Sequence, residues 1–138
     1  MKVLIVDDDD DARKLVRKAL APLTDDIQEV ADGADALKHA LADPPDLVIL
    51  DVVMPGVDGY EICYLIKSAP ELRHTRVIVL TVRHQKIDIS IGRGAFADAY
   101  LVKPASAEKL RAVIGKLERG ERGPFPASKR PEPPAGKD

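Results

Sequence analysis

Residues 46–59 read DLVILDVVMPGVDG: an unbroken apolar run, then Asp51, then a loop that contains proline and glycine. Apolar residues that do not alternate with polar ones are typical of a strand buried on both faces of a parallel sheet. Asp51 comes directly after that strand. Open α/β sheets bind their ligands outside the carboxyl ends of the strands, so this stretch indicates an α/β fold with a functional group at the sheet edge.

Three further apolar runs end in a polar or charged residue. They are residues 3–6 before Asp7 and Asp8, residues 77–80 before Thr81, and residues 100–102 before Lys103. Parallel strands bring their carboxyl ends to the same edge of a sheet. We therefore expect these side chains to meet Asp51 there.

Strand and helix patterns alternate along the chain, which predicts a doubly wound (βα)5 domain with a five-stranded parallel sheet, flavodoxin-like. The predicted strands are residues 2–6, 27–30, 46–50, 76–80 and 98–102. The predicted helices are residues 10–21, 34–42, 58–68, 85–94 and 106–119. Residues 85–94 carry an alternating isoleucine pattern that also suits a strand, but a crossover helix is required before the last strand.

The predicted domain covers residues 1–119. Residues 120–138 are rich in proline and glycine and poor in apolar side chains, so we expect a disordered tail or a linker there. The single cysteine, Cys63, excludes an internal disulfide and suits a reducing cytoplasm. The first predicted strand begins almost at the N-terminus, so the sequence leaves no room for a signal peptide before it. We therefore expect a cytoplasmic protein.

The charge and the apolar content exclude some kinds of partner. A net charge of -2 provides no basic surface for direct nucleic-acid binding. No apolar run approaches the roughly 20 residues that a membrane span needs, so we expect no membrane insertion.

Asp7, Asp8 and Asp51 would repel one another if they met, unless a hard divalent cation bound between them. Mg²⁺ needs few protein carboxylates and bridges to phosphate oxygens. Lys103 adds a point charge for a phosphate and Thr81 adds a hydroxyl group. These groups together are the parts needed for phosphoryl transfer onto an aspartate, with Mg²⁺ as the cofactor.

With these motifs the sequence resembles the receiver domains of bacterial two-component response regulators, which are CheY-like. The resemblance covers residues 1–119 and rests on Asp7-Asp8, on Asp51 with the loop after it, on Thr81, and on Tyr100-Leu101-Val102-Lys103-Pro104. It implies a sheet of strand order 2-1-3-4-5. It also implies that a sensor histidine kinase or a phosphotransfer protein phosphorylates Asp51, and that a changed surface then signals to an effector protein that the sequence does not identify.

The resemblance also implies a role for each site residue. Asp8 and Asp51 would ligate Mg²⁺ directly with the carbonyl of Val53, and Asp7 would act through water. The residues implied around the phosphoryl group are Lys103 as its contact, Thr81 as the hydroxyl that follows it, Tyr100 as an aromatic switch, and Pro104 after a cis peptide bond. The oligomeric state implied is a monomer or a weak phosphorylation-dependent homodimer.

Two other functions stay open. A receiver fold can serve as a docking module without phosphorylation, although such modules tend to lose pocket residues and none is lost here. A phosphatase that forms an aspartyl phosphate would use a second carboxylate two residues after Asp51, where this chain has Val53. Tyr100 could also be a plain core residue. The chain departs from the family pattern at Val82, where Ala or Gly is usual, and at Phe96, where Gly usually ends the fourth helix.

Overall fold

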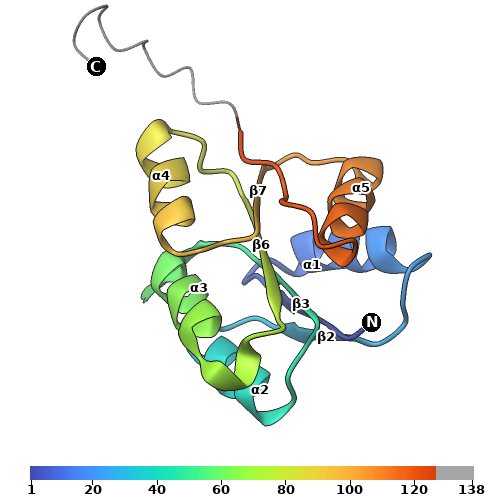
Figure 1. The fold of residues 1–138 in the computed structure, drawn as a ribbon, viewed down its shortest axis with the longest axis horizontal. Coiled ribbons are helices and arrows are strands. Elements are labelled where there is room, and N and C mark those ends of the chain that lie inside the picture. Colours follow the sequence, from blue (N-terminus) through green and yellow to red (C-terminus); the bar gives the residue numbers. More distant parts are fainter. Residues whose placement is uncertain (127–138) are drawn as a thin grey trace, which may run out of the picture.

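The computed structural model describes residues 1–126. Its main sheet consists of β1 (Val3–Val6), β2 (Ile27–Val30), β3 (Leu47–Leu50), β6 (Arg76–Thr81) and β7 (Ala99–Val102). All of its strand pairs are parallel, in the order β2-β1-β3-β6-β7. The predicted fold class and strand order are therefore confirmed (Figure 1).

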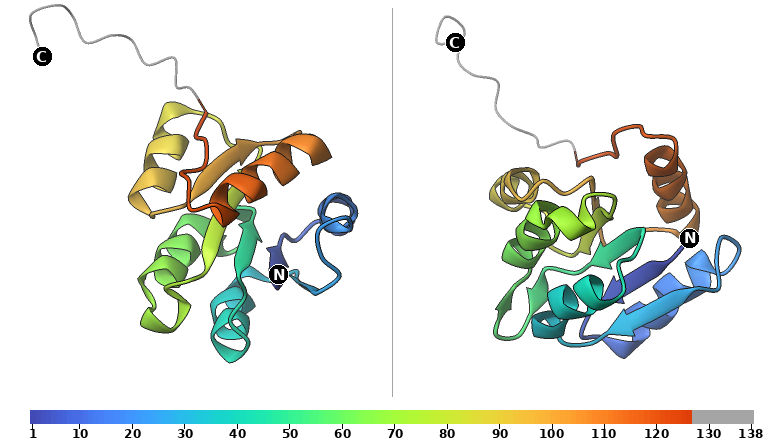
Figure 2. Two further views of the ribbon diagram at one scale, coloured as in Figure 1. Left: turned by 45° about the vertical axis from the view of Figure 1, so that its right-hand side comes forward. Right: turned by 60° about the horizontal axis from the view of Figure 1, so that its bottom comes forward.

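The helices lie between these strands and cover both faces of the sheet. They are α1 (Asp10–Leu20), α2 (Ala36–Ala42), α3 (Gly59–Ser68), α4 (Lys86–Gly94) and α5 (Ala107–Glu118), with short 3₁₀ turns at Gly33–Asp35 and Pro70–Leu72. α1 and α5 lie on one face, and α2, α3 and α4 on the other (Figure 2). A hydrophobic core lies on each face of the sheet, and alternate residues of β3 belong to one or the other. Leu47 and Ile49 pack towards α1 and α5, whereas Val48 and Leu50 pack towards the other helices.

Most of residues 85–94, whose pattern is ambiguous, form a helix: α4 runs from Lys86 to Gly94, and Gln85 is its N-cap. Gln85 and Asp88 make reciprocal bonds to each other's backbone, which is the capping-box arrangement that begins a helix. Ser106 likewise accepts a hydrogen bond from the backbone of Lys109 at the start of α5. Local capping therefore supports both helices in addition to the packing of their apolar faces.

Three local features add detail to the predicted pattern. The loop after β3 contains a small antiparallel hairpin, β4 (Val53–Met54) with β5 (Val57–Asp58). Phe96 ends the turn after α4 with a φ of 65°, a left-handed conformation that costs a non-glycine residue roughly 1–2 kcal/mol. Leu15 of α1 is 70% exposed.

Residues 120–126, the first part of the predicted tail or linker, contact the sheet. Gly120 adopts a φ of 77° after α5, Gly123 hydrogen-bonds to Asp98 just before β7, and Pro124 hydrogen-bonds to Tyr100 in β7. Residues 127–138, the rest of the predicted tail, lie outside the described part of the chain. Within residues 1–126, no helix is both long enough and apolar enough to cross a membrane.

Candidate functional site

The register of the sheet brings the predicted polar residues together. Val6 pairs with Leu50, so Asp7 and Asp51 leave adjacent strands at the same level. Thr81 pairs with Val102, which places Lys103 at the same edge. Asp7, Asp51 and Thr81 are all buried, although each carries a polar side chain.

Lys103 lies between the two buried carboxylates. Its ammonium group donates hydrogen bonds to Asp7 Oδ2 and to Asp51 Oδ2, both over 2.8 Å. Only 22% of the Lys103 side chain is exposed, against 6% for Asp7 and 9% for Asp51. Burial alone would lower the pKa of Lys103, but the bonds to Asp51 and Asp7 outweigh it and the pKa lies above its ordinary value. The lysine therefore stays a cation and offsets the repulsion of the carboxylates.

Both oxygen atoms of Asp51 have a partner. Oδ1 accepts a hydrogen bond from the backbone N–H of Val53 over 2.9 Å, while Oδ2 faces Lys103. Asp7 is held in a similar way, because its Oδ1 accepts from the backbone N–H of Asp9 over 3.0 Å. These contacts fix the orientation of the two carboxylates before any ligand arrives.

Asp8 differs from its neighbour, because it is exposed and not part of the buried pair. Among residues 1–126, no three His, Cys, Asp or Glu side chains gather into a group that could hold a metal ion. The ligands that the family resemblance implies are nevertheless all oxygen atoms, from Asp7, Asp8, Asp51 and the carbonyl of Val53, and Mg²⁺ prefers such ligands and retains several of its waters. The donor chemistry fits Mg²⁺, while the full ligand set is not already assembled.

A chain of hydrogen bonds leads away from the pocket. The backbone N–H of Arg83 donates to Thr81 Oγ1 over 3.4 Å, and the carbonyl of Arg83 accepts from the Tyr100 hydroxyl over 2.9 Å. The hydroxyls of Tyr100 and Tyr60 lie 2.8 Å apart. Burial is the main cause that raises the pKa of Tyr100. The Tyr100 ring is thus part of the core, and its hydroxyl is linked to Arg83, which in turn bonds Thr81 of the pocket.

Sequence reasoning missed Tyr60, because a tyrosine after the glycine of the loop gives no sign of a partner 40 residues away.

The residues flanking the pocket are apolar and open to solvent: Val53 is 39% exposed and Val82 is 57% exposed. Arg83 lies beside them and pairs with Asp88 over 3.4 Å. Lys103 is followed by Pro104 across a cis peptide bond.

Comparison with protein families gives one assignment. The family described as the response regulator receiver domain matches residues 3–115. Among curated proteins, the transcriptional regulatory protein AfsQ1 of Streptomyces coelicolor is 38% identical over 121 residues, which cover 87% of this chain and 52% of that protein. This chain therefore spans about half the length of that relative. Protein PilG of Pseudomonas aeruginosa is 34% identical over 83% of this chain and 84% of its own length.

The chain also superposes on solved structures of response regulators. The BeF3-activated receiver domain of DrrB, a Thermotoga maritima protein, superposes with a TM-score of 0.77 at 33% identity and covers 86% of this chain and 97% of its own. Chemotaxis protein CheY4 of Vibrio cholerae superposes with a TM-score of 0.74 at 30% identity, covering 86% of this chain and 96% of its own.

Proposed function

Because the chain belongs to the family of two-component response regulator receiver domains, we propose that Asp51 accepts a phosphoryl group from a phosphohistidine and so switches a protein-interaction surface. The donor would be a sensor histidine kinase or a phosphotransfer protein, and the setting would be the cytoplasm. The observation that carries the proposal is the buried Asp51 carboxylate, held at the sheet edge between the Val53 N–H and the Lys103 ammonium.

In the transfer, a carboxylate oxygen of Asp51 forms a bond to phosphorus as the bond between phosphorus and the donor imidazole breaks. The imidazole nitrogen keeps the electron pair of that bond. Lys103 already lies 2.8 Å from Asp51 Oδ2 and can turn its positive charge to the phosphoryl oxygens as they arrive. Positioning and charge stabilisation of this kind supply most of the catalysis in phosphoryl transfer.

A Mg²⁺ ion held by Asp8, Asp51 and the Val53 carbonyl, with Asp7 through water, would neutralise charge on the phosphoryl oxygens. Asp8 is exposed and adjacent to the buried pair, which suits a ligand that meets a hydrated ion from the solvent side. Lys103 then has a second use, because its charge keeps Asp7 and Asp51 together when no cation is bound.

The signal would leave the pocket through Thr81. Once a phosphoryl group sits on Asp51, the Thr81 hydroxyl can donate a hydrogen bond to it. The Arg83 N–H that now bonds Thr81 would move with it, and the Arg83 carbonyl holds the Tyr100 hydroxyl. A change at Asp51 would therefore reach Tyr100 through one short backbone segment.

Two features argue against the other functions. Turnover as a phosphatase needs an acid or base near the phosphoaspartate, and the position two residues after Asp51 is the half-exposed, apolar Val53. A docking module without phosphorylation would have no need of a lysine held between two buried carboxylates. We take residues 1–119 as the switch domain in this proposal.

The proposal is tested by incubating the chain with Mg²⁺ and a phosphohistidine-bearing donor. We expect label to move to the chain and to be removed by hydroxylamine, which cleaves acyl phosphates and leaves phosphoserine and phosphothreonine intact. Label that resists hydroxylamine, or no label with any phosphohistidine or acetyl phosphate donor, would contradict the proposal.

A further inference from the structure

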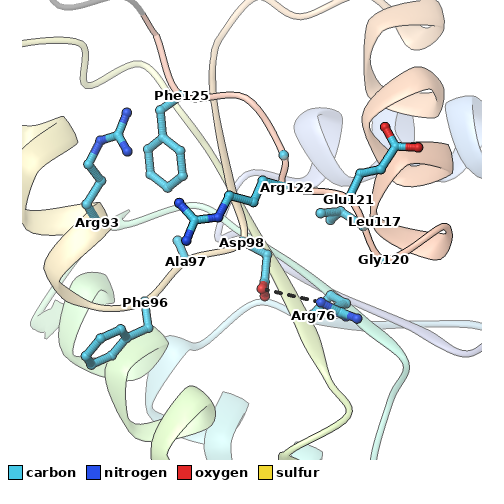
Figure 3. A pocket seen from close by; sticks show the side chains of 11 residues that line it. Arg76, Arg93, Phe96, Ala97, Asp98, Leu117, Gly120, Glu121, Arg122 and Phe125 are labelled. Atoms are coloured by element: carbon cyan, nitrogen blue, oxygen red, sulfur yellow. Dashed lines mark ion pairs between the residues drawn. The ribbon is translucent and has the colours of Figure 1, made fainter.

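The chain turns back on itself directly after α5. Gly120 takes the left-handed conformation, its N–H donates to the carbonyl of Leu117, and the N–H of Glu121 donates to the carbonyl of Lys116. This is the Schellman arrangement, which satisfies the last carbonyls of a helix and redirects the chain. Here it sends residues 121–126, which we call the C-terminal strap, across the end of the sheet next to β7 (Figure 3).

The strap bonds along the free edge of the sheet, to β7, which is its last strand, and to the residue just before β7. The N–H of Gly123 donates to the carbonyl of Asp98 over 3.1 Å, and the N–H of Tyr100 donates to the carbonyl of Pro124 over 2.9 Å. An open sheet edge presents unpaired backbone groups that can pair with another chain. The strap pairs with one such group of β7, the N–H of Tyr100, and with the carbonyl of Asp98 just before β7.

The fit of the strap to β7 depends on the absence of a side chain at Gly123. A Cβ atom at this position would lie 2.4 Å from the Cβ of Ala99 and 2.6 Å from the carbonyl oxygen of Asp98. Real Cβ atoms do not approach other atoms so closely, and backbone on β7 cannot easily give way. The strap can therefore lie this close to Ala99 and Asp98 only because residue 123 is a glycine.

One aromatic side chain anchors the strap. The ring of Phe125 packs against the ring of Tyr100, with centroids 6.2 Å apart. The guanidinium carbon of Arg93, on α4, lies 4.3 Å from the centroid of the same ring, so the strap joins α4 to β7 (Figure 3). A cation over an aromatic face is attracted to the ring, so this contact favours the docked position of the strap.

We propose that the C-terminal strap is an intramolecular regulatory element that closes the β7 edge and holds the Tyr100 ring in its buried position. Tyr100 is the point of coupling, because its backbone N–H and its ring both contact the strap while its hydroxyl bonds the Arg83 carbonyl. A partner that pairs with the β7 edge must first displace the strap. Displacing it also frees one side of Tyr100.

The coupling runs in both directions. If the strap favours one position of Tyr100, a ligand in the acidic pocket that shifts Tyr100 must change the stability of the strap by the same free energy. The contact with β7 stands on its own, whereas this link to the pocket rests on the proposed function. The experiment therefore has one arm for each.

The first arm measures amide hydrogen exchange in the full chain. Gly123→Ala should force the strap from β7, and Phe125→Ala should remove its anchor without a clash. In both variants we expect the Tyr100 amide to exchange at least tenfold faster, while the amides of β1 and β3 keep their protection. Gly94→Ala is the control, because a Cβ there meets nothing within 4 Å.

Unchanged protection of the Tyr100 amide in both strap variants would overturn the proposal. If Gly123→Ala speeds exchange throughout the sheet, the Phe125→Ala variant decides the question. Loss of protection at the Tyr100 amide alone supports the proposal, and unchanged protection there overturns it.

The second arm measures the affinity of the same variants for beryllofluoride with Mg²⁺, as an analogue of the phosphoryl group. A change of threefold or more in either strap variant, with Gly94→Ala unchanged, supports the link to the pocket. Equal affinities would remove that link. Absence of beryllofluoride binding in the wild-type chain would contradict the proposed function and leave the exchange result to judge the strap.

Discussion

The Lys103 ammonium donates a hydrogen bond to Asp51 Oδ2 over 2.8 Å, although 52 residues separate the two in the chain. The same ammonium bonds Asp7 Oδ2, so one cation holds two buried carboxylates. Removing either carboxylate leaves the other paired, whereas removing the lysine leaves two like charges side by side in a poorly solvated pocket. The lysine is therefore both a structural and a chemical requirement of the site.

Lys103→Met should lower the free energy of unfolding in the absence of divalent cations. Loss of one partner from a fully buried pair costs 3–5 kcal/mol, and we expect about 1–3 kcal/mol here because solvent reaches the pocket. Mg²⁺ should recover much of the loss, since it replaces the missing positive charge. Urea unfolding with and without Mg²⁺ checks this.

Lys67→Met is the matched control for that experiment. Lys67 bonds Asp98 over 2.8 Å at a similar exposure but lies outside the acidic pocket. It should destabilise the chain without any recovery by Mg²⁺. Equal recovery in the two variants would show that the cation acts elsewhere.

Mg²⁺ should also raise the melting temperature of the wild-type chain. Binding to the folded state alone contributes about 2.7 kcal/mol at a hundredfold excess over Kd. Asp8→Ala should abolish the rise, whereas Asp11→Ala, a change to an exposed carboxylate in the first turn of α1, should keep it. A wild-type melting temperature that millimolar Mg²⁺ leaves unchanged would count against the metal site.

The aspartyl phosphate should be long-lived. Its hydrolysis needs a water in line with the phosphorus atom, and Val53, two residues after Asp51, offers that water no hydrogen bond. Val82 narrows access to the pocket, and Arg83, two residues after Thr81, would shield the phosphate. Val53→Asn supplies an amide at one of these positions and should speed the loss of phosphate severalfold. Decay of radiolabel at saturating Mg²⁺, without EDTA, measures it. Equal or slower decay in the variant would refute the explanation.

Two glycines of α4 should respond oppositely to alanine. A Cβ at Gly92 would lie 2.8 Å from Cδ2 of Tyr100, so Gly92→Ala should push the ring from its place. We expect the free energy of unfolding to fall by about 1–3 kcal/mol because the core is overpacked. Gly94→Ala meets open space and should gain up to about 1 kcal/mol of helix propensity. Thermal unfolding of the two variants is sufficient, and a gain in both would show that Tyr100 is not confined by Gly92.

The sequence was informative where one short pattern determines position. Apolar runs that end in Asp7, Asp51, Thr81 and Lys103 place those residues by strand geometry alone, because parallel strands in register share an edge. The sequence was uninformative where contacts join distant residues. The bond between Tyr60 and Tyr100 is one example.

The C-terminal strap shows the same limit. Its composition predicts no packing, since glycine and proline bury little surface. One backbone bond to β7, one to Asp98 just before it, and the ring of Phe125 nevertheless place the strap. Asp8 is a different case, because the pattern that pairs it with Asp7 does not reveal that one side chain is buried and the other exposed.

The most direct test of the account is the mass of the intact chain after incubation with acetyl phosphate and Mg²⁺, for the wild type and for Asp51→Asn. Asparagine keeps the shape of the side chain and removes the nucleophilic oxygen. We predict that the wild type gains the mass of one phosphoryl group and that Asp51→Asn gains none. An equal gain in Asp51→Asn would mean that another residue accepts the phosphoryl group and would contradict the account.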